Sequence, residues 1–195
     1  WEKGSAYEEE VVAGLDIPFL DLTPYSLEEK EIKTLEAIEK KEPLIYRGRI
    51  SADDLLGEPD LLRLEEDEYV AGDIKSGGGE EGTEDDPRPK KHYAVQLALY
   101  TDILERKGLS SKREPFVWDI HGEEVTYELD ELTGKKDPTT LWNIYQETLN
   151  EVRGTVNRTE NSTPAYISKC KLCHWKTECM KTLKNSDDLT LLPEL

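Results

Sequence analysis

The sequence predicts an α/β (α+β) fold in which helices and strands are interleaved along the chain. Apolar residues recur at helical spacing in some segments and alternate at strand spacing in others. These segments follow one another as helix, helix, three strands, helix, two strands, helix and a cysteine-containing tail. A chain of 195 residues is long enough to bury a sizeable core, so we expect one main domain with at most a small appendage.

Two helices are expected before the first strand. Residues 2–15 carry apolar positions at loosely helical spacing, and Pro18 ends the segment. Ser26 followed three residues later by Glu29 is typical of a capping box, which predicts a second helix that reaches about Lys41.

The first group of strands is expected at 44–50, 61–64 and 69–75. The last two should form a hairpin through the polar link 65–68. Residues 76–90 contain three consecutive glycines and few apolar side chains, so we expect a mobile loop beside the site instead of packed structure.

A helix, two strands and another helix should complete the main domain. Apolar spacing predicts a helix over 91–107, and alternation predicts strands over 115–120 and 123–129. Asp137 followed by a proline is typical of an N-cap, which predicts a last helix over 138–153.

The charge of the chain restricts its class. A formal net charge of -18 disfavours nonspecific attraction to nucleic acid, because that binding depends on phosphate neutralisation by lysine and arginine. An enzyme that holds divalent cations is less affected, since bound metal reverses the local electrostatics of a carboxylate cluster. No apolar run has the length of a membrane span and no signal peptide is evident, so we expect a cytoplasmic protein with no membrane partner.

One acid–lysine pair has a geometry that the others lack. An acid two residues before a lysine occurs five times, about as often as chance allows, and four of the five lie in segments with helical spacing. Only Asp73 and Lys75 lie in an expected strand. The period of two puts them on one face and Val70 and Ile74 on the other, so Asp73 and Lys75 converge on a common point.

Three further residues complete a candidate site. Asp60 ends a Gly-Glu-Pro-Asp turn before a strand, and Gln96 and Tyr100 lie one turn apart on the helix that follows. Together with the pair Asp73 and Lys75, these are the side chains that a metal-dependent phosphodiesterase requires. The plain alternatives are a solvated turn for Asp60, a strand end for Lys75 and ordinary helix positions for the Gln–Tyr pair.

Other polar residues near these positions are weaker candidates. His92 and His121 lie at element ends and are expected to be exposed. Arg88, Lys90 and Lys91 could contact a phosphate backbone, although such a cluster is more often a solvated face.

Three cysteines lie within ten residues near the end of the chain, at Cys170, Cys173 and Cys179. Three thiols cannot form a self-contained disulfide set, so reduced thiolates that bind metal are the better interpretation. Zinc sites and iron-sulfur clusters both prefer four ligands, and His174 is too close to Cys173 along the chain to reach the same ion easily. Three incidental packed cysteines are the remaining alternative.

These motifs, in this order and spacing, resemble the PD-(D/E)XK nucleases of the RecB type. The resemblance rests on Asp60, Asp73-Ile74-Lys75, Gln96-x3-Tyr100 and the terminal Cys-x2-Cys-x5-Cys. It is nearest to predicted RecB-like nucleases with a cysteine-rich C-terminus, which are related to the iron-sulfur CRISPR adaptation nucleases. The resemblance implies a restriction-endonuclease-like mixed central sheet flanked by helices.

The same resemblance implies two parts and a metal site. The nuclease core would occupy 1–160, and a cysteine-cluster segment packed on it would occupy 161–195. Asp60 and Asp73 would bind Mg2+ or Mn2+, with the Ile74 carbonyl as a further ligand.

Relatives place a histidine ligand on the first helix, and here Tyr7 stands at that position. Glu8 beside it is the expected substitute as a metal ligand. Lys75 would orient or activate the attacking water, and Gln96 and Tyr100 would position the lysine and the scissile phosphate.

The resemblance also implies a [4Fe-4S] cluster, with one cysteine upstream of the core and three at the end. This chain lacks the upstream cysteine. The chain opens at Trp1 inside an expected helix, so we expect it to be a piece of a longer protein. Zinc is the second choice of cofactor.

The predicted function is a metal-dependent deoxyribonuclease in DNA repair, recombination or defence. Its substrate would be single-stranded DNA or duplex ends, and a fused or associated helicase or other DNA-processing protein is compatible with this assignment. Two alternatives stay open: a nucleic-acid-binding or assembly module that has lost turnover, and a zinc-stabilised interaction domain without nuclease ancestry.

Overall fold

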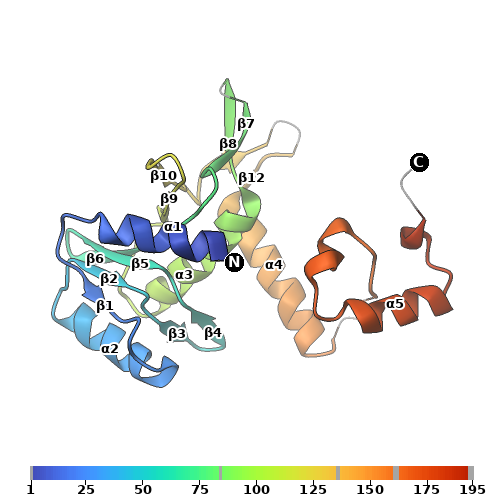
Figure 1. Cartoon of the computed structure of the whole chain (residues 1–195), viewed down its shortest axis with the longest axis horizontal. Helices are drawn as coiled ribbons and strands as arrows, with labels where there is room; N and C mark the ends of the chain where they lie inside the picture. The colour runs from blue at the N-terminus through green and yellow to red at the C-terminus, as the bar shows by residue number, and fades with distance from the viewer. Residues whose placement is uncertain (1, 84, 135–136, 160–162, 193–195) are drawn as a thin grey trace. The chain divides into compact units, whose positions relative to one another are not determined.

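The computed structural model describes residues 2–83, 85–134, 137–159 and 163–192, and it has mixed α and β structure (Figure 1). The helices are α1 (Glu2–Ala13), α2 (Leu27–Glu39), α3 (Lys91–Arg106), α4 (Leu141–Val156), α5 (Lys176–Asn185) and two short 3-10 turns, η1 (Ser168–Leu172) and η2 (Leu189–Leu191). The strands are β1 (Leu20–Asp21), β2 (Leu44–Tyr46), β3 (Ile50–Ala52), β4 (Leu55–Gly57), β5 (Leu61–Glu65), β6 (Glu68–Ile74), β7 (Glu80–Thr83), β8 (Asp86–Pro89), β9 (Phe116–Trp118), β10 (Glu124–Thr126), β11 (Leu132–Thr133) and β12 (Thr139–Thr140).

The chain divides into two compact units, Trp1–Thr148 and Leu149–Leu195, and the division falls within α4. The boundary that the sequence predicts, between residues 160 and 161, lies outside the described residues. The first unit contains the sheets and the candidate site, and the second contains the three cysteines.

The first unit is built on a mixed six-stranded sheet in the order β1-β2-β5-β6-β9-β10. β2, β5 and β6 are antiparallel neighbours, whereas β1 runs parallel to β2 and β9 runs parallel to β6. The mixed central sheet flanked by helices confirms the predicted fold class and is consistent with a restriction-endonuclease-like fold.

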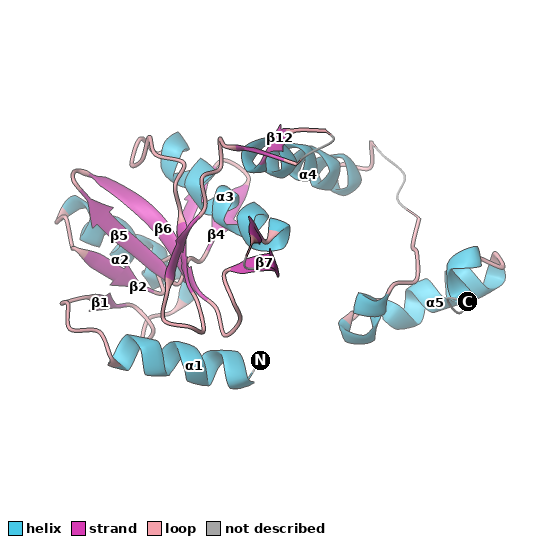
Figure 2. Ribbon diagram, turned by 90° about the horizontal axis from the view of Figure 1, so that it is seen from above, coloured by secondary structure: helices cyan, strands magenta, loops and turns pink. Residues whose placement is uncertain are grey.

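The two faces of the sheet bury different partners. Apolar side chains of α1, including Val11 and Val12, pack against Val70 and Ile74 on one face of β6. The other face of β6 contacts α3, and Figure 2 shows α1 and α3 on opposite sides of the sheet. The strand period therefore separates Asp73 from the α1 face, as the sequence predicts.

The second helix begins as predicted. Ser26 and Glu29 form a complete capping box, in which each side chain bonds the backbone of the other, so that the first turn of α2 has its donors satisfied. The buried face of α2 includes Ala37 and Ile38, which pack against the rest of the first unit.

Three expectations about elements were wrong. The segment 44–50 is not one strand, because Arg47 adopts a left-handed conformation with φ of 58° and ends β2. The segment 76–90 contains the β7–β8 hairpin. Its strands pair through their backbone groups, so the low content of apolar side chains did not indicate them. The last helix begins at Leu141, where the Thr140 hydroxyl accepts from the Asn143 N–H, and not after Asp137.

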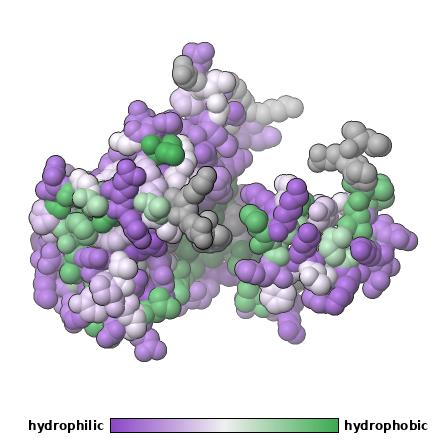
Figure 3. Space-filling view, in the orientation of Figure 1, coloured by the Kyte–Doolittle hydropathy of each residue, from purple (hydrophilic) through white to green (hydrophobic). Residues whose placement is uncertain are grey.

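The surface is strongly hydrophilic, as the net charge requires. Figure 3 shows hydrophilic residues over most of the visible face of each unit, with apolar residues in separate small groups. Across the part of the chain that the structure describes, no helix combines the length and the hydrophobicity that a membrane crossing needs.

Gly72 is required by the packing of β6 on β9. A Cβ atom built on Gly72 would lie 2.3 Å from the Phe116 ring, which is much shorter than a van der Waals contact. We expect Gly72→Ala to lower the free energy of unfolding by about 2–3 kcal/mol, because the core must shift to admit the methyl group. Urea denaturation followed by circular dichroism measures the change.

Gly14 provides the matched control, because a Cβ there would meet only ordinary contacts at 3.5 Å. Gly14→Ala should change stability by less than about 0.5 kcal/mol. A Gly72→Ala variant as stable as Gly14→Ala would contradict the packing described for β6.

Candidate active site

Two buried carboxylates meet where β5 begins and β6 ends. The register pairs Leu61 with Gly72, which places Asp60 and Asp73 on adjacent strands at the same level of the sheet. The backbone N–H of Ile74 donates to Asp60 Oδ2 at 2.9 Å, which fixes the orientation of that carboxyl group. Both side chains are buried, and Asp73 is only 2 % exposed.

The Asp73 carboxyl lies in an environment that disfavours its charge. Burial raises the pKa of Asp73, and the neighbouring Asp60 raises it further, while the Lys75 ammonium acts in the opposite direction. Asp73 Oδ2 forms an ion pair with Lys75 but accepts no hydrogen bond of ordinary geometry from any described residue. The Lys75 ammonium is therefore the positive charge that compensates Asp73.

A chain of hydrogen bonds leads from Lys75 into α3. Lys75 Nζ donates to Gln96 Oε1 at 3.1 Å, and Gln96 Nε2 donates to the Tyr100 hydroxyl at 2.8 Å. Tyr100 in turn donates to the Glu58 carbonyl at 3.3 Å. The helical spacing of Gln96 and Tyr100 thus holds the lysine beside Asp73, and the structure brings these four predicted residues together with Asp60.

Close packing of α3 on β4 supports this chain. A Cβ atom on Gly57 would lie 2.6 Å from the Tyr100 ring, so only glycine allows the helix to approach this closely. Burial raises the pKa of Tyr100, which keeps its hydroxyl protonated and able to donate.

A second lysine, Lys90, lies with Lys75 near the ring of Tyr93. Lys75 Nζ and Lys90 Nζ each lie 5.2 Å from the centre of the Tyr93 ring. Lys90 Nζ also donates to the Gly78 carbonyl at 2.6 Å, which holds it near the site. His92 and His121 are exposed, as the sequence predicts.

Glu8, the ligand that the sequence predicts on the first helix, lies near Asp60. Glu8 is buried, and its carboxylate accepts from the Tyr46 hydroxyl at 2.9 Å and is paired with Arg47. Burial raises the pKa of Glu8, and Asp60 adds to that effect. The Tyr7 hydroxyl instead donates to the Asp119 carbonyl, so it does not join the carboxylates.

Arg47 is the residue that sequence reasoning missed. Its Nη1 atom lies 3.5 Å from Asp60 Oδ1, and its other terminal nitrogen contacts Glu8. The sequence places Arg47 inside an alternating apolar run, where it reads as an outward-facing strand residue. Only the adjacent Gly48 hints at the break in the strand.

The donor set suits a hard divalent cation. No group of three or more His, Cys, Asp or Glu side chains in the described ranges is arranged to hold a metal ion. Mg2+, however, usually keeps several waters and needs only one or two carboxylates besides its substrate. The buried carboxyl groups of Asp60 and Asp73 lie at the same level of adjacent strands and supply the one or two carboxylates that such a site needs.

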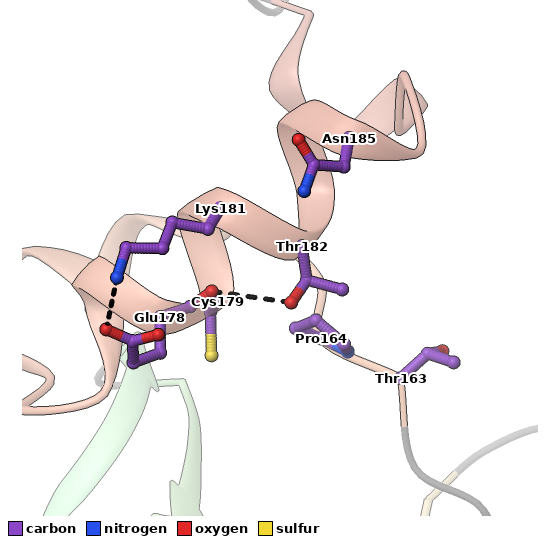
Figure 4. A pocket seen from close by; sticks show the side chains of 7 residues that line it. All are labelled: Thr163, Pro164, Glu178, Cys179, Lys181, Thr182 and Asn185. Atoms are coloured by element: carbon purple, nitrogen blue, oxygen red, sulfur yellow. Dashed lines mark hydrogen bonds and ion pairs between the residues drawn. The ribbon is translucent and has the colours of Figure 1, made fainter.

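The three cysteines are not gathered into a metal-binding group in the second unit. Cys170 lies in η1, and its thiol donates to the Ala165 carbonyl at 3.7 Å. Cys173 follows η1 and is exposed, and Cys179 lies in α5. Figure 4 shows Cys179 beside a cavity of about 440 Å3 that neither of the other cysteines lines.

Comparisons with known proteins agree with the geometry of the first unit. The model of the PD-(D/E)XK nuclease superfamily matches residues 19–180. No curated protein matches the chain. The crystal structure of SSO0001 is similar at 17 % identity with a TM-score of 0.37, covering 90 % of this chain and 92 % of that one.

The environment of Asp73 predicts a pH dependence of stability. Because folding raises the pKa of Asp73, the protonated form contributes stability that is complete below the ordinary value of 3.8 and is lost as the pH rises through the raised value. In the absence of divalent metal, we expect Asp73→Asn to be more stable than the wild type at about pH 9 by on the order of 1–2 kcal/mol. Urea denaturation in EDTA, repeated from acidic to alkaline pH, measures the difference, which should shrink toward pH 4.

Asp119 provides a control, because its pKa shifts in the opposite direction to that of Asp73. Burial acts to raise the pKa of Asp119, but hydrogen bonds from three backbone N–H groups outweigh it and the pKa is lowered. Asp119→Asn should therefore lose stability at neutral and alkaline pH. If Asp73→Asn were also less stable than the wild type at about pH 9, the account of the carboxylate pair would be wrong.

Proposed function

Since the chain belongs to the PD-(D/E)XK nuclease superfamily, we propose that it is a divalent-metal-dependent nuclease that hydrolyses phosphodiester bonds in DNA. One observation carries the proposal: the ammonium of Lys75 is held between the buried Asp73 carboxylate and Gln96, next to a second buried carboxylate. Such a grouping places a fixed ammonium beside two acidic side chains that can hold a divalent cation.

In this proposal Asp60 and Asp73 hold Mg2+ or Mn2+, with the Ile74 carbonyl and Glu8 as further ligands. The bound ion would polarise the phosphoryl group and lower the pKa of a coordinated water. The carboxylates themselves supply hard oxygen donors at positions that the β5–β6 register and the Ile74 hydrogen bond already fix.

Lys75 acts on the reacting phosphate. Its ammonium is a compact point charge on a rigid strand, and it can orient the attacking water and stabilise the charge that develops on a nonbridging oxygen. Gln96 and Tyr100 keep the ammonium in place through the hydrogen-bond chain from α3. Hydrolysis would leave a 5′-phosphate and a 3′-hydroxyl.

The substrate proposed is single-stranded DNA or the ends of a duplex, within repair, recombination or defence in the cytoplasm. A helicase or another DNA-processing protein, fused or associated, is a compatible partner.

A second candidate function is a DNA-binding or assembly module without turnover. Two contacts favour it: the Tyr7 hydroxyl is directed to the Asp119 carbonyl instead of the carboxylates, and Arg47 already pairs with Glu8 and Asp60. The two candidates differ in whether the wild type cleaves DNA when Mg2+ or Mn2+ is added.

We expect Lys75→Ala to reduce the cleavage rate by about 100-fold or more, because an ammonium that stabilises transition-state charge is lost. The measurement uses fluorescently labelled single-stranded and duplex DNA, with Mg2+, with Mn2+ and with EDTA. Lys41→Ala is the matched control, since that lysine pairs with the exposed Asp67 and should keep full activity.

Equal rates for the wild type and Lys75→Ala would remove the lysine from the mechanism. Binding of DNA without cleavage in either metal would support the noncatalytic module.

The cysteine segment is proposed to bind a [4Fe-4S] cluster, with zinc as the second choice. The described residues offer three thiols, so a fourth ligand would have to come from elsewhere. We expect anaerobic reconstitution with iron and sulfide to give visible absorbance that Cys173→Ser weakens and His174→Ala leaves unchanged. Stoichiometric zinc with no visible absorbance would refute the iron-sulfur assignment.

A further inference from the structure

Arg47 occupies the place of a cation between two of the carboxylates assigned to the metal. Its Nη2 atom contacts the Glu8 carboxylate, and its Nη1 atom lies 3.5 Å from Asp60 Oδ1. Its backbone N–H donates to the Asp60 carbonyl at 2.8 Å, so the arginine is anchored to the strand that carries one of these carboxylates. The guanidinium therefore lies next to two of the carboxylates that the proposed function assigns to the ion.

The backbone at Arg47 is specialised for this position. A φ of 58° is uncommon for a residue with a side chain, and it persists only where the surroundings require it. Here the turn ends β2 and carries the side chain toward Asp60.

The charges around Arg47 favour replacement of the arginine by a divalent ion. The carboxyl groups of Glu8 and Asp60 lie next to the Arg47 guanidinium, and Asp73 is paired with Lys75. A divalent ion added while Arg47 stayed in place would lie within a few ångströms of a positive guanidinium, where like charges repel strongly. An ion that takes the place of the guanidinium meets no such repulsion from Arg47.

The fold also provides room for the displaced side chain. Arg47 is 38 % exposed, and together with Glu8 it lines a cavity of about 520 Å3. The cavity is also lined by Glu9 and Asp21, whose carboxylates are alternative partners for a guanidinium.

We propose that Arg47 is an exchangeable internal cation, which holds Glu8 and Asp60 in the metal-free protein and must leave them for a divalent ion to bind. This inference rests on the proposed function, since it concerns the same carboxylates. It makes Arg47 a positioning residue that sets metal affinity by competition.

The test measures Mn2+ binding by electron paramagnetic resonance, without DNA and without any activity assay. Arg47→Met keeps the length of the side chain and removes its charge, and we expect it to bind Mn2+ about tenfold more tightly than the wild type. Arg49→Met is the matched control, because Arg49 follows Arg47 closely in the chain but pairs with the exposed Glu58. Its Mn2+ affinity should stay within about twofold of the wild type.

A second measurement covers the case in which Arg47→Met does not fold. In the wild type, the side-chain Nε–H resonance of Arg47 is followed by NMR during titration with Mg2+. We expect it to shift and to narrow as the guanidinium leaves its carboxylate partners. A resonance that Mg2+ leaves unchanged would overturn the proposal.

Failure of this inference can be distinguished from failure of the proposed function. Mn2+ binding that Asp60→Asn abolishes but Arg47→Met does not tighten would overturn the role of Arg47 and leave the metal site in place. No Mn2+ binding by the wild type or by Arg47→Met would overturn both.

Discussion

The repulsion between two buried carboxylates is the constraint on which the candidate site depends. Asp60 and Asp73 lie together on adjacent strands, where burial and their mutual charge raise the pKa of Asp73. Protein interiors tolerate such a pair only when cations or donors compensate for it. The Lys75 ammonium compensates Asp73 on one side, and the Arg47 guanidinium compensates Asp60 on the other.

The fold places these groups by close approach of backbone to aromatic rings. Gly72 lets β6 lie against Phe116, and Gly57 lets α3 bring Tyr100 against β4. A methyl group at either glycine would move a strand that carries or precedes an acidic residue. The geometry of the site is thus set by packing on both of its sides, although its chemistry is carried by polar atoms.

The alternation of side chains along β6 was enough to predict that Asp73 and Lys75 share one face, because strand geometry alone determines it. The mixed fold class followed from apolar spacing in the same way. Arg47 could not be predicted, because its role depends on a left-handed turn and on Asp60, which is distant in sequence. The β7–β8 hairpin escaped prediction because backbone pairing stabilises it without apolar side chains.

The overall charge makes dependence on metal the expected solution for a polyanionic substrate. A chain with a formal net charge of -18 repels nucleic acid at long range, so binding must rely on cations concentrated at one place. Lys75 Nζ and Lys90 Nζ each lie 5.2 Å from the centre of the Tyr93 ring, and Arg47 is paired with Glu8. A divalent ion would therefore act twice, first by cancelling negative charge at the phosphate position and then by freeing a guanidinium that is otherwise occupied. In the proposed function, binding of metal would therefore precede binding of nucleic acid.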